Sequence, residues 1–314
     1  MTTVAGTGVA GYSGDEGLAT SARFTEPKGI ALDSSGNIYV SDTSDNVIRM
    51  ITKSTGIITT VAGTGRRSRY YVHDTGDGGL AMNATFYYPQ GIALDTYGNI
   101  YVTDTLNYVI RMITKSTGII TKVAGTGISS YNGDGGLATS ATIGLCFGVA
   151  LDASGNIYVS DAYYNVIRMI TKSTGIITTV AGTGQSTSYD GYNIGDGGLA
   201  TNATFDNLAG VALDTSGNIY VADGNNHVIR KITKSTGIIS TVAGTKNGIN
   251  LRFGYTGDGG LATSATIGPC YNIALDASEN IFISGTKFNV IRKITKSTGI
   301  ITTVAGTPTK SNLN

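Results

Sequence analysis

One pattern recurs five times along this 314-residue chain, and it limits the possible folds more than any other feature. Its first copy reads Gly-Ile-Ala-Leu-Asp over 29–33, Asn-Ile-Tyr-Val-Ser-Asp over 37–42, Val-Ile-Arg-Met-Ile over 47–51 and Ile-Ile-Thr-Thr-Val-Ala-Gly-Thr over 57–64. The marker Asn-Ile-Tyr or Asn-Ile-Phe begins at Asn37, Asn99, Asn156, Asn218 and Asn280, in steps of 57 or 62 residues. A period of this length indicates an array of units that bury their apolar surfaces against one another.

Each copy contains four short runs rich in Ile, Val, Tyr and Thr, separated by glycine-containing turns, which predicts four antiparallel strands, a to d. Residues 33–37 would join strands a and b, and residues 52–56 strands c and d. Strand b is apolar without alternation, so both of its faces must be covered. Four-stranded meanders stacked face to face supply that cover, which predicts an all-β fold, a β-propeller. A parallel β-helix is the main alternative, although it would not need two tight hairpins per copy.

Five complete copies predict a single propeller domain over residues 1–314, with five blades. Val-Ala-Gly-Thr occurs six times, so a copy of strand d lies near each end of the chain, within 1–8 and 299–307. We expect these terminal strands to take part in closing the ring. Six blades are the alternative, and the extra blade would then need residues from a partner chain or another segment.

Bulk composition narrows the range of partners. The 22 Lys and Arg residues nearly balance the 21 Asp and Glu residues, so no general attraction to nucleic acid or to an anionic membrane is expected. The chain has no apolar run of 18 residues, so a membrane span is not expected. Its N-terminus lacks the charged and apolar regions of a signal peptide, so a signal peptide is not expected either. The two cysteines, Cys146 and Cys270, hold equivalent positions in the third and fifth copies, which predicts buried free thiols.

The repeated strings resemble a known family. P-x-G-I-A-L-D from Pro27, G-N-I-Y-V-x-D-T from Gly36 and N-V-I-R from Asn46 are similar to the NHL repeat. The elements V-A-G-T-G and G-D-G-G-L-A, the latter at 76–81 in the second copy, resemble the long NHL repeats of large secreted and cell-surface proteins. The resemblance implies a propeller, commonly of six blades, with a recognition role and a location outside the cell or at its surface.

Three sets of repeated polar residues are predicted to be structural. We expect Asp42, Asp104, Asp161 and Asp223 at the ends of strands b to pair with the strand c arginines, and the aspartates that open the a–b turns to bond their own backbone. The Gly-Asp-Gly-Gly aspartates are expected to shape a loop, with a calcium site as the weaker alternative. The fifth copy departs from the pattern at Glu279 and Gly285, so its blade should be looser.

Chemistry on a propeller of this kind relies on histidines and carboxylates that converge on the channel, as the resemblance to related enzymes implies. This chain has only His73 and His227, in unlike loop positions, and it shows no G-x-S-x-G, H-E-x-x-H or P-loop motif. We therefore predict no catalytic residue, no metal site and no cofactor, with calcium as the one weak possibility. A metal-dependent enzyme is the least favoured functional class.

The copies differ in only two places, the segment from strand d to the next strand a and the b–c loop. In a meander both leave from the same face, so one face should be variable and rich in Tyr, Arg, Asn and Phe, residues that supply contact energy at recognition sites. The candidate ligand-binding residues in the d-to-a segments are Arg66, Arg67, Arg69, Tyr70, Tyr71, His73, Tyr131, Tyr189, Tyr192, Arg252, Phe253 and Tyr255. Those in the b–c loops are Tyr108, Tyr163, Tyr164, Asn225, Asn226, His227 and Phe288.

These residues predict a recognition propeller that binds protein or glycan, although unconstrained drift of loops could also make them variable. A structural module of a larger extracellular assembly is the alternative, with self-assembly through an unpaired terminal strand. Asn83 and Asn202 begin N-x-T sequons at equivalent places and are possible glycosylation sites.

Overall fold

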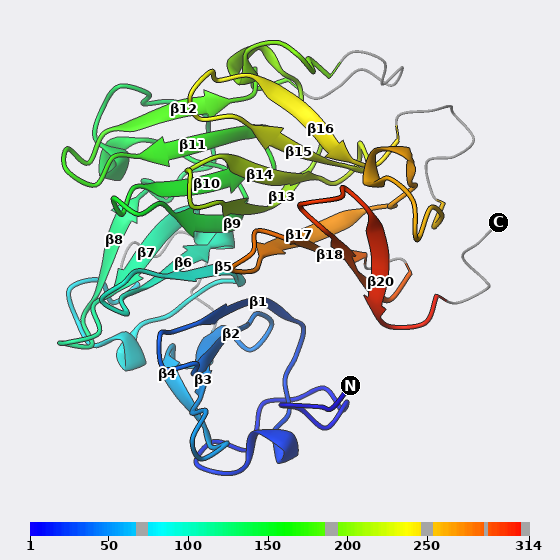
Figure 1. Ribbon diagram of the computed structural model, residues 1–314. Helices are drawn as coiled ribbons and strands as arrows, with labels where there is room; N and C mark the ends of the chain where they lie inside the picture. Colours follow the sequence, from blue (N-terminus) through cyan, green and yellow to red (C-terminus); the bar gives the residue numbers. More distant parts are fainter. Residues whose placement is uncertain (67–74, 186–193, 246–253, 286–287, 309–314) are drawn as a thin grey trace. The chain divides into compact units, whose positions relative to one another are not determined.

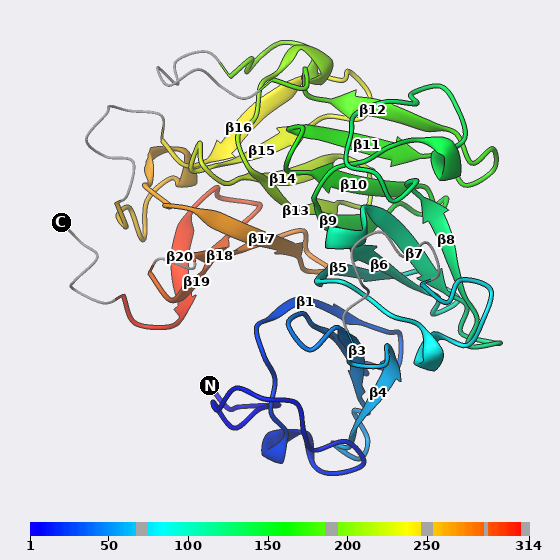
Figure 2. The same ribbon diagram turned by 180° about the vertical axis from the view of Figure 1, so that it is seen from behind.

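The computed structural model describes residues 1–66, 75–185, 194–245, 254–285 and 288–308. Within these residues the chain forms five four-stranded antiparallel sheets, one for each copy of the repeat, and the strands of each sheet are neighbours in chain order (Figures 1 and 2). The predicted all-β class, a propeller of four-stranded blades, is confirmed, and the blade number is five. The described residues contain no helix long and apolar enough to cross a membrane.

The strand bounds follow the repeat closely. The first sheet contains β1 (Pro27–Leu32), β2 (Ile38–Asp42), β3 (Val47–Ile51) and β4 (Ile58–Ala62). The second contains β5 (Pro89–Leu94), β6 (Ile100–Asp104), β7 (Val109–Ile113) and β8 (Ile120–Ala124). The third contains β9 (Cys146–Leu151), β10 (Ile157–Asp161), β11 (Val166–Ile170) and β12 (Ile177–Ala181). The fourth contains β13 (Leu208–Leu213), β14 (Ile219–Asp223), β15 (Val228–Ile232) and β16 (Ile239–Ala243). The fifth contains β17 (Cys270–Leu275), β18 (Ile281–Gly285), β19 (Val290–Ile294) and β20 (Ile301–Ala305).

Short 3-10 helices interrupt the connections. Five follow the Gly-Asp-Gly-Gly-type elements, namely η1 (Ala19–Ser21), η2 (Ala81–Asn83), η4 (Ala138–Ser140), η5 (Ala200–Asn202) and η6 (Ala262–Ser264). The sixth in the described residues, η3 (Thr105–Asn107), lies in the b–c loop of the second blade. The alanine that begins each of the five is buried.

The chain divides into two compact units, Met1–Leu151 with Ile170–Ile177, and Asp152–Met169 with Thr178–Asn314. The first unit holds the first two sheets, and the second holds the fourth and fifth. At the C-terminal end β20 pairs with β19 and completes the fifth sheet, whereas residues 1–8 form no strand. Gly6 instead donates its backbone N–H to the carbonyl of Ala19. Closure by both terminal segments stays a prediction.

The a–b and c–d turns of each blade are joined by one aspartate and one asparagine. The Asp33 carboxylate accepts the backbone N–H groups of Ser35 and Asn37, at 2.9 Å each, and the Asn37 side-chain amide. The side-chain oxygen of Asn37, Oδ1, in turn accepts the backbone N–H of Lys53 in the c–d turn, at 3.0 Å. The same contacts recur around Asp95, Asp214 and Asp276, which confirms the predicted turn role and explains why the marker asparagine is uniform.

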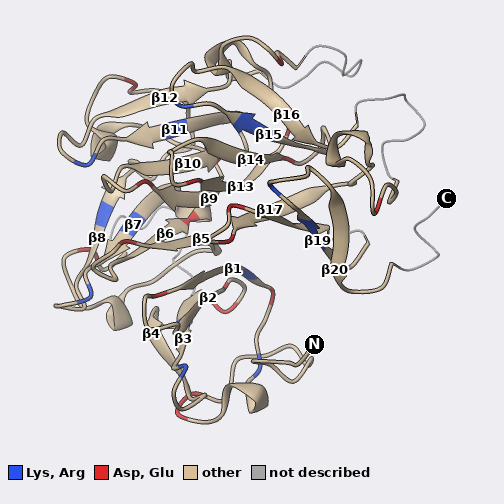
Figure 3. Cartoon of the chain, in the orientation of Figure 1, with Lys and Arg blue, Asp and Glu red and all other residues tan. Residues whose placement is uncertain are grey.

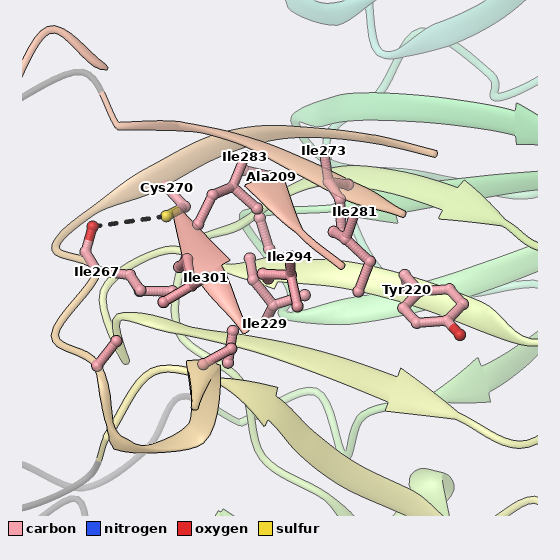
Figure 4. Packing of buried hydrophobic residues seen from close by; sticks show 14 residues of the cluster. Ala209, Tyr220, Ile229, Ile267, Cys270, Ile273, Ile281, Ile283, Ile294 and Ile301 are labelled. Carbon is pink, nitrogen blue, oxygen red and sulfur yellow. Dashed lines mark hydrogen bonds between the residues drawn. The ribbon is translucent and has the colours of Figure 1, made fainter. Parts of the chain in front are cut away.

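Apolar residues fill the space between neighbouring blades. In the first unit Tyr39 and Ile48 belong to one buried cluster with Phe86, Ile92 and Ile113 of the second blade. In the second unit the residues from the fourth and fifth blades form a matching cluster, shown in Figure 4. Full burial of an Ile side chain stabilises a fold by about 1.5–3 kcal/mol, so these contacts hold the blades together. Cys146 and Cys270 are buried free thiols, as predicted, and burial raises the pKa of Cys270 to about 12.

Hydroxyl groups on β2 and directly after it add polar contacts between the first two blades. Ser41 Oγ accepts the backbone N–H of Gly29 at 2.7 Å and donates to the carbonyl of Gln90 in the next blade at 2.6 Å. Thr43 donates to the Pro89 carbonyl at 2.6 Å. These buried groups satisfy one another, which removes the cost of leaving them without partners.

Each blade has one buried arginine on its third strand. Arg49 of β3 is fully buried, and Figure 3 shows basic positions recurring on third strands such as β15 and β19. The Arg49 Nη2 group donates to Asp15 Oδ1 at 2.6 Å and to the Ser13 carbonyl at 3.0 Å, and Nη1 donates to the Arg23 carbonyl at 2.8 Å. The predicted partner Asp42 is also present, with Oδ2 at 3.6 Å from Nη1. Equivalent pairs join Arg111 to Asp77 and Asp104, and Arg230 to Asp196 and Asp223.

The fifth blade differs at the two predicted positions. Arg292 retains Asp258 as a carboxylate partner at 2.6 Å, while Gly285 stands where other blades have a buried aspartate. Glu279 adopts a left-handed backbone, with φ of 59°, and forms an ion pair with Lys296. Glu279 holds the place of a turn glycine in other blades, and its side chain makes the ion pair possible. At Gly36, Gly98 and Gly217 the side chain of the c–d turn lysine occupies the space where a Cβ atom would lie.

We expect the stability of the protein to fall as pH rises from 5 to 8. Burial raises the pKa of Asp42 to about 7 and the pKa values of Asp104 and Asp223 to about 6, against about 3.9 in an unfolded chain. A carboxyl group whose pKa is higher in the folded state than in the unfolded chain binds its proton more tightly when the protein is folded. This stabilises the folded state fully below the unfolded pKa, and the stabilisation is lost as pH rises through the folded pKa values of 6 to 7. Urea unfolding at pH 5 and pH 8 should show this loss, and Asp42→Asn should reduce it. Equal losses in the two proteins would contradict the assignment.

Candidate recognition face

The two variable connections of a blade lie at the same end of its sheet, as the meander requires. In the first blade the backbone N–H of Ser44, in the b–c loop, donates to the carbonyl of Thr25 just before β1, at 3.1 Å. Leu106 bonds to Tyr87 at 3.0 Å in the second blade, and Asn225 bonds to Asp206 at 3.1 Å in the fourth. We call this end of each blade the variable end, and the end with the a–b and c–d turns the uniform end.

Many of the predicted binding residues lie outside the described residues. These are Arg67, Arg69, Tyr70, Tyr71, His73, Tyr189, Tyr192, Arg252 and Phe253. Their proposed role stays a prediction.

In the first unit, Arg66 is exposed, and Tyr108 and Tyr131 are half-buried. A polar group absent from the predicted set lies at the same end. Glu26 accepts hydrogen bonds from the hydroxyls of Ser44, at 2.8 Å, and Tyr88, at 2.9 Å, and these two bonds lower the pKa of Glu26. Glu26 therefore presents an anionic carboxylate at the variable end of the first blade. The sequence signal that could have identified this polar group is the position of Tyr88, directly before strand a of the second copy.

In the second unit, Tyr163 is the most exposed of the described candidate aromatics, at 62 %. Its ring lies edge-on to that of Tyr164, with 4.9 Å between centroids. The backbone N–H of Tyr164 donates to Asp161 Oδ1 at 3.1 Å, so the buried aspartate at the end of β10 fixes this loop. In the next blade Asn225 is exposed and donates to Asp206, while Asn226 donates to Asp223 at 2.9 Å.

Two predicted residues, Phe288 and His227, are buried in their blades, and a third, Tyr255, is half-buried against a buried arginine. Phe288 is fully buried, with its ring 5.7 Å from that of Tyr255. The Tyr255 ring covers the Arg292 guanidinium at 4.7 Å, and its hydroxyl donates to Asp258 at 3.0 Å and contacts Thr303. His227 is only 9 % exposed. Tyr255 and Phe288 thus serve the core of the fifth blade, where Tyr255 covers the buried Arg292 as Tyr12 covers Arg49 in the first blade.

One position of the b–c loops carries local strain. Asn46, Tyr108, Asn165, His227 and Asn289 all have a left-handed backbone, with φ between 52° and 56°. Asn tolerates this conformation, and the Asn46 and Asn165 side chains accept the backbone N–H groups of Tyr88 and Asn207, at 2.9 Å each. Tyr108 has neither the tolerance of asparagine for this backbone conformation nor a side-chain amide oxygen that could accept such a bond. A residue that departs from the local conformational preference is a marker of function, so Tyr108 is a favoured candidate.

The Gly-Asp-Gly-Gly element has a structural use in the described blades. Burial acts to raise the pKa of Asp15, but hydrogen bonds from Thr60 and Arg49 outweigh it and lower the pKa. Its carboxylate is thus committed to the buried arginine, which supports the predicted loop-shaping role. The described residues contain no group of three or more His, Cys, Asp or Glu side chains able to hold a metal ion.

The possible glycosylation sites occupy matching exposed places. Asn83 and Asn202 end the short helices η2 and η5, and both side chains are exposed. The following alanines, Ala84 and Ala203, are fully buried. Glycosylation at these positions stays a prediction.

The fold and the loops define a class, a propeller with one uniform and one variable end to each blade. The family described as the teneurin NHL domain matches residues 7–70, 61–132 and 180–254. These matches cover well over half of the chain, and the chain belongs to this family of NHL-repeat propellers.

Full-length relatives share the repeat at low identity. The protein SUPPRESSOR OF QUENCHING 1, chloroplastic, of Arabidopsis thaliana is 25 % identical over 92 % of this chain and 27 % of its own length. Teneurin-3 of Mus musculus is 28 % identical over 83 % of this chain and 10 % of its own length. The chain thus spans about a quarter or less of these two relatives.

Solved structures show the same fold in proteins of different activities. An auxiliary nutrient binding protein from Bacteroides thetaiotaomicron has a TM-score of 0.61 and 16 % identity, covering 88 % of this chain and 60 % of that one. Virginiamycin B lyase from Staphylococcus aureus has a TM-score of 0.51 and 18 % identity, covering 88 % of this chain and 69 % of that one. Because one is named as a binding protein and the other as a lyase, the shared fold does not decide between binding and catalysis.

Replacing Tyr108 by Asn should stabilise the protein by about 1 kcal/mol, because asparagine accepts a left-handed backbone with little strain. Urea unfolding measures this change. The reverse substitution at the equivalent position of another blade, Asn165→Tyr, is the matched control and should destabilise by a similar amount. A destabilised Tyr108→Asn variant would contradict the strain argument.

Removal of divalent cations should leave the melting temperature unchanged, because the Asp15, Asp77 and Asp258 carboxylates are bound to buried arginines. Protein purified without chelator can be melted with and without EDTA. A melting temperature that falls with EDTA and recovers on adding calcium would show that the weaker alternative, a calcium site, is correct.

Proposed function

We propose that this chain is a non-enzymatic recognition propeller that binds a protein or glycan through the variable ends of its blades. The main support for this proposal is the pair Tyr163 and Tyr164. Tyr163 is exposed, and the ring of Tyr164 packs edge-on against it. The buried Asp161 holds their loop through the backbone N–H of Tyr164. A tyrosine so held presents a large amphipathic surface at a low entropic cost, which is how tyrosines contribute at recognition sites.

The contrast between the two ends of the blades supports this proposal. The uniform ends repeat the same Asp-Asn-Lys turn contacts from blade to blade, and these contacts are internal. The variable ends carry side chains that serve no shared structural purpose, such as Tyr163, Asn225 and Arg66. The strained Tyr108 adds a second feature of the same kind in the first unit. Membership of the NHL family is consistent with a recognition role.

A location outside the cell or at its surface is part of this proposal. It rests on the low net charge and on the family resemblance. Relatives differ in this respect, since one is named as chloroplastic. Secretion by a eukaryotic cell would also make the exposed Asn83 and Asn202 available for glycosylation.

A paired screen tests the proposal. The chain is applied to a printed glycan array and to a displayed library of protein ectodomains, and the strongest ligand is titrated against variants. Tyr163→Ala with Tyr164→Ala should weaken binding about 10- to 100-fold, the effect typical of interface tyrosines. Tyr97→Ala is the matched control, because Tyr97 is 74 % exposed in an a–b turn at the uniform end, and it should bind as the wild type does.

Two outcomes contradict the proposal. One is a ligand whose affinity falls equally in the double variant and in the Tyr97→Ala control. The other is the failure of both screens to yield any ligand that the wild-type protein binds.

A further inference from the structure

The buried aspartate that ends the second strand has three hydrogen-bond donors in two of the blades. In the second blade Asp104 accepts the backbone N–H of Tyr87 at 2.8 Å and the side-chain amide of Asn107 at 2.9 Å. Nη1 of Arg111 is the third donor, at 3.4 Å. Asp223 of the fourth blade has the equivalent three donors. A buried carboxylate needs donors of this kind to compensate for the loss of water.

Asp42 of the first blade retains only one of these donors within the described residues. Its Oδ1 atom accepts the backbone N–H of Thr25 at 2.8 Å. Its Oδ2 atom is buried and lies 3.6 Å from Nη1 of Arg49, which is beyond hydrogen-bonding distance. Among the residues that the structure describes, Oδ2 has no hydrogen-bond partner at all. The Asp42 side chain is nevertheless fully buried, so an ionised carboxylate there is poorly compensated.

The third residue of the b–c loop is the cause of this difference. The chain has Asp45 where the second and fourth blades have Asn107 and Asn226. Each of those asparagines donates its amide to the aspartate three residues earlier, and the Asp45 carboxyl group lies close enough to that of Asp42 to share a hydrogen bond. The Asp45 Oδ2 atom is also buried and without a hydrogen-bond partner in the described chain. An ionised carboxylate only accepts hydrogen bonds, so Asp45 cannot replace the amide unless one of the two groups carries a proton.

We propose that Asp42 and Asp45 share one proton near neutral pH, and that loss of this proton releases the b–c loop at residues 43–46. Asp42 donates its O–H to a carboxylate oxygen of Asp45, so the proton takes the place of the amide N–H in the other two blades. When the proton passes to water, two negative charges are left in contact in a buried position. Asp45 is half-buried whereas Asp42 is fully buried, so the Asp45 side chain turns to water.

The surrounding charges leave the pair in need of that proton. Arg49 on β3 is the cation beside Asp42, but its Nε and Nη2 groups donate to Asp15 Oδ1, at 3.2 and 2.6 Å. Its Nη1 group donates to the Arg23 carbonyl at 2.8 Å. On the β1 side the charged groups are Glu26, which accepts the hydroxyl of a loop serine at 2.8 Å, and Lys28, which acts electrostatically on Glu26. The positive charge next to the pair is therefore already matched by another carboxylate.

The b–c loop carries contacts that this proton would control. Ser44 donates its hydroxyl to Glu26 at 2.8 Å, and the Asn46 side chain accepts the backbone N–H of Tyr88, in the next blade, at 2.9 Å. Tyr88 donates its own hydroxyl to Glu26 at 2.9 Å. When the two carboxyl groups separate, the loop residues on both sides of Asp45 move as well. Loss of the proton therefore loosens the variable end of the first blade, and the placing of Glu26 and Tyr88 becomes dependent on pH.

The pKa values agree with this geometry. Burial, and after it the negative charge of Asp45, raises the pKa of Asp42 to about 7. Burial raises the pKa of Asp104 and of Asp223, which have amide partners, only to about 6. Because the folded pKa of Asp42 lies above that of an exposed aspartate, the closed loop is favoured below about pH 7 and loses this support as pH rises through that value.

Hydrogen exchange of the intact chain, without any ligand, tests the proposal. Protection factors, which correct for the intrinsic effect of pH on exchange, are measured at pH 6 and pH 8 for the amides of 43–46. With a pKa of about 7 in the closed loop and about 4 in the open one, protection should fall about tenfold between these pH values. The result does not depend on the proposed recognition role, because no ligand takes part.

Two matched variants exchange the residues of the first and fourth blades. Asp45→Asn supplies the amide that Asp104 and Asp223 have, so protection at 43–46 should fall only about twofold, as expected for a pKa of about 6. Asn226→Asp creates the pair in the fourth blade, where the fall at 224–227 should grow from about twofold to about tenfold. Circular dichroism and melting curves confirm that both variants are folded.

Three results would overturn the proposal. One is equal protection of 43–46 at pH 6 and pH 8 in the wild type. Another is a fall of about tenfold that persists in Asp45→Asn, which would show that Asp42 alone is responsible. The third is protection that returns at pH 8 when calcium or magnesium is added to the wild type but not to Asp45→Asn, which would show that the two carboxylates bind a cation and not a proton.

Discussion

The architecture depends on burying one guanidinium group in each described blade without leaving it unpaired. A charge taken out of water costs several kcal/mol unless hydrogen bonds and an opposite charge compensate it. Arg49 meets this condition with partners from three separate parts of the chain: Asp15 in the incoming segment, the Arg23 carbonyl before β1 and Asp42 at the end of β2. The planar group also lies under the Phe24 ring, at 4.9 Å. Because these contacts fix the incoming segment after the variable stretch, that stretch can change length and sequence without disturbing the sheet.

Much of this arrangement could be predicted from the sequence. The five sheets, the turn aspartates, the Asp–Arg pairs and the buried thiols all follow from residues that repeat in register. The principal partner of each arginine could not be found in this way, because Asp15 and Arg49 are 34 residues apart and belong to different repeated elements. The bridging hydroxyls of Ser41 and Thr43 were missed for a related reason: their partners are backbone carbonyls, which carry no sequence signal.

The candidate binding residues were predicted less well than the fold. Composition identified aromatic residues in the variable connections, but it does not distinguish a tyrosine that faces solvent from one that covers a buried cation. Tyr163 and Tyr255 illustrate the two cases, and only the contacts of Tyr255 with Arg292 and Asp258 separate them. The strain at Tyr108 is also invisible to composition, since it depends on the backbone conformation that the asparagines of other blades reveal.

The near-identity of the strands has a consequence for how the chain reaches its native state. A strand such as Val47–Ile51 differs from Val109–Ile113 and Val166–Ile170 at no position, so the local sequence gives a folding polypeptide no means of choosing among them. Correct pairing must then come from proximity along the chain, which favours the nearest hairpin over a distant identical partner. Synthesis from the N-terminus, one copy at a time, would preserve that advantage, whereas refolding of the whole denatured polypeptide exposes every copy at once to its duplicates.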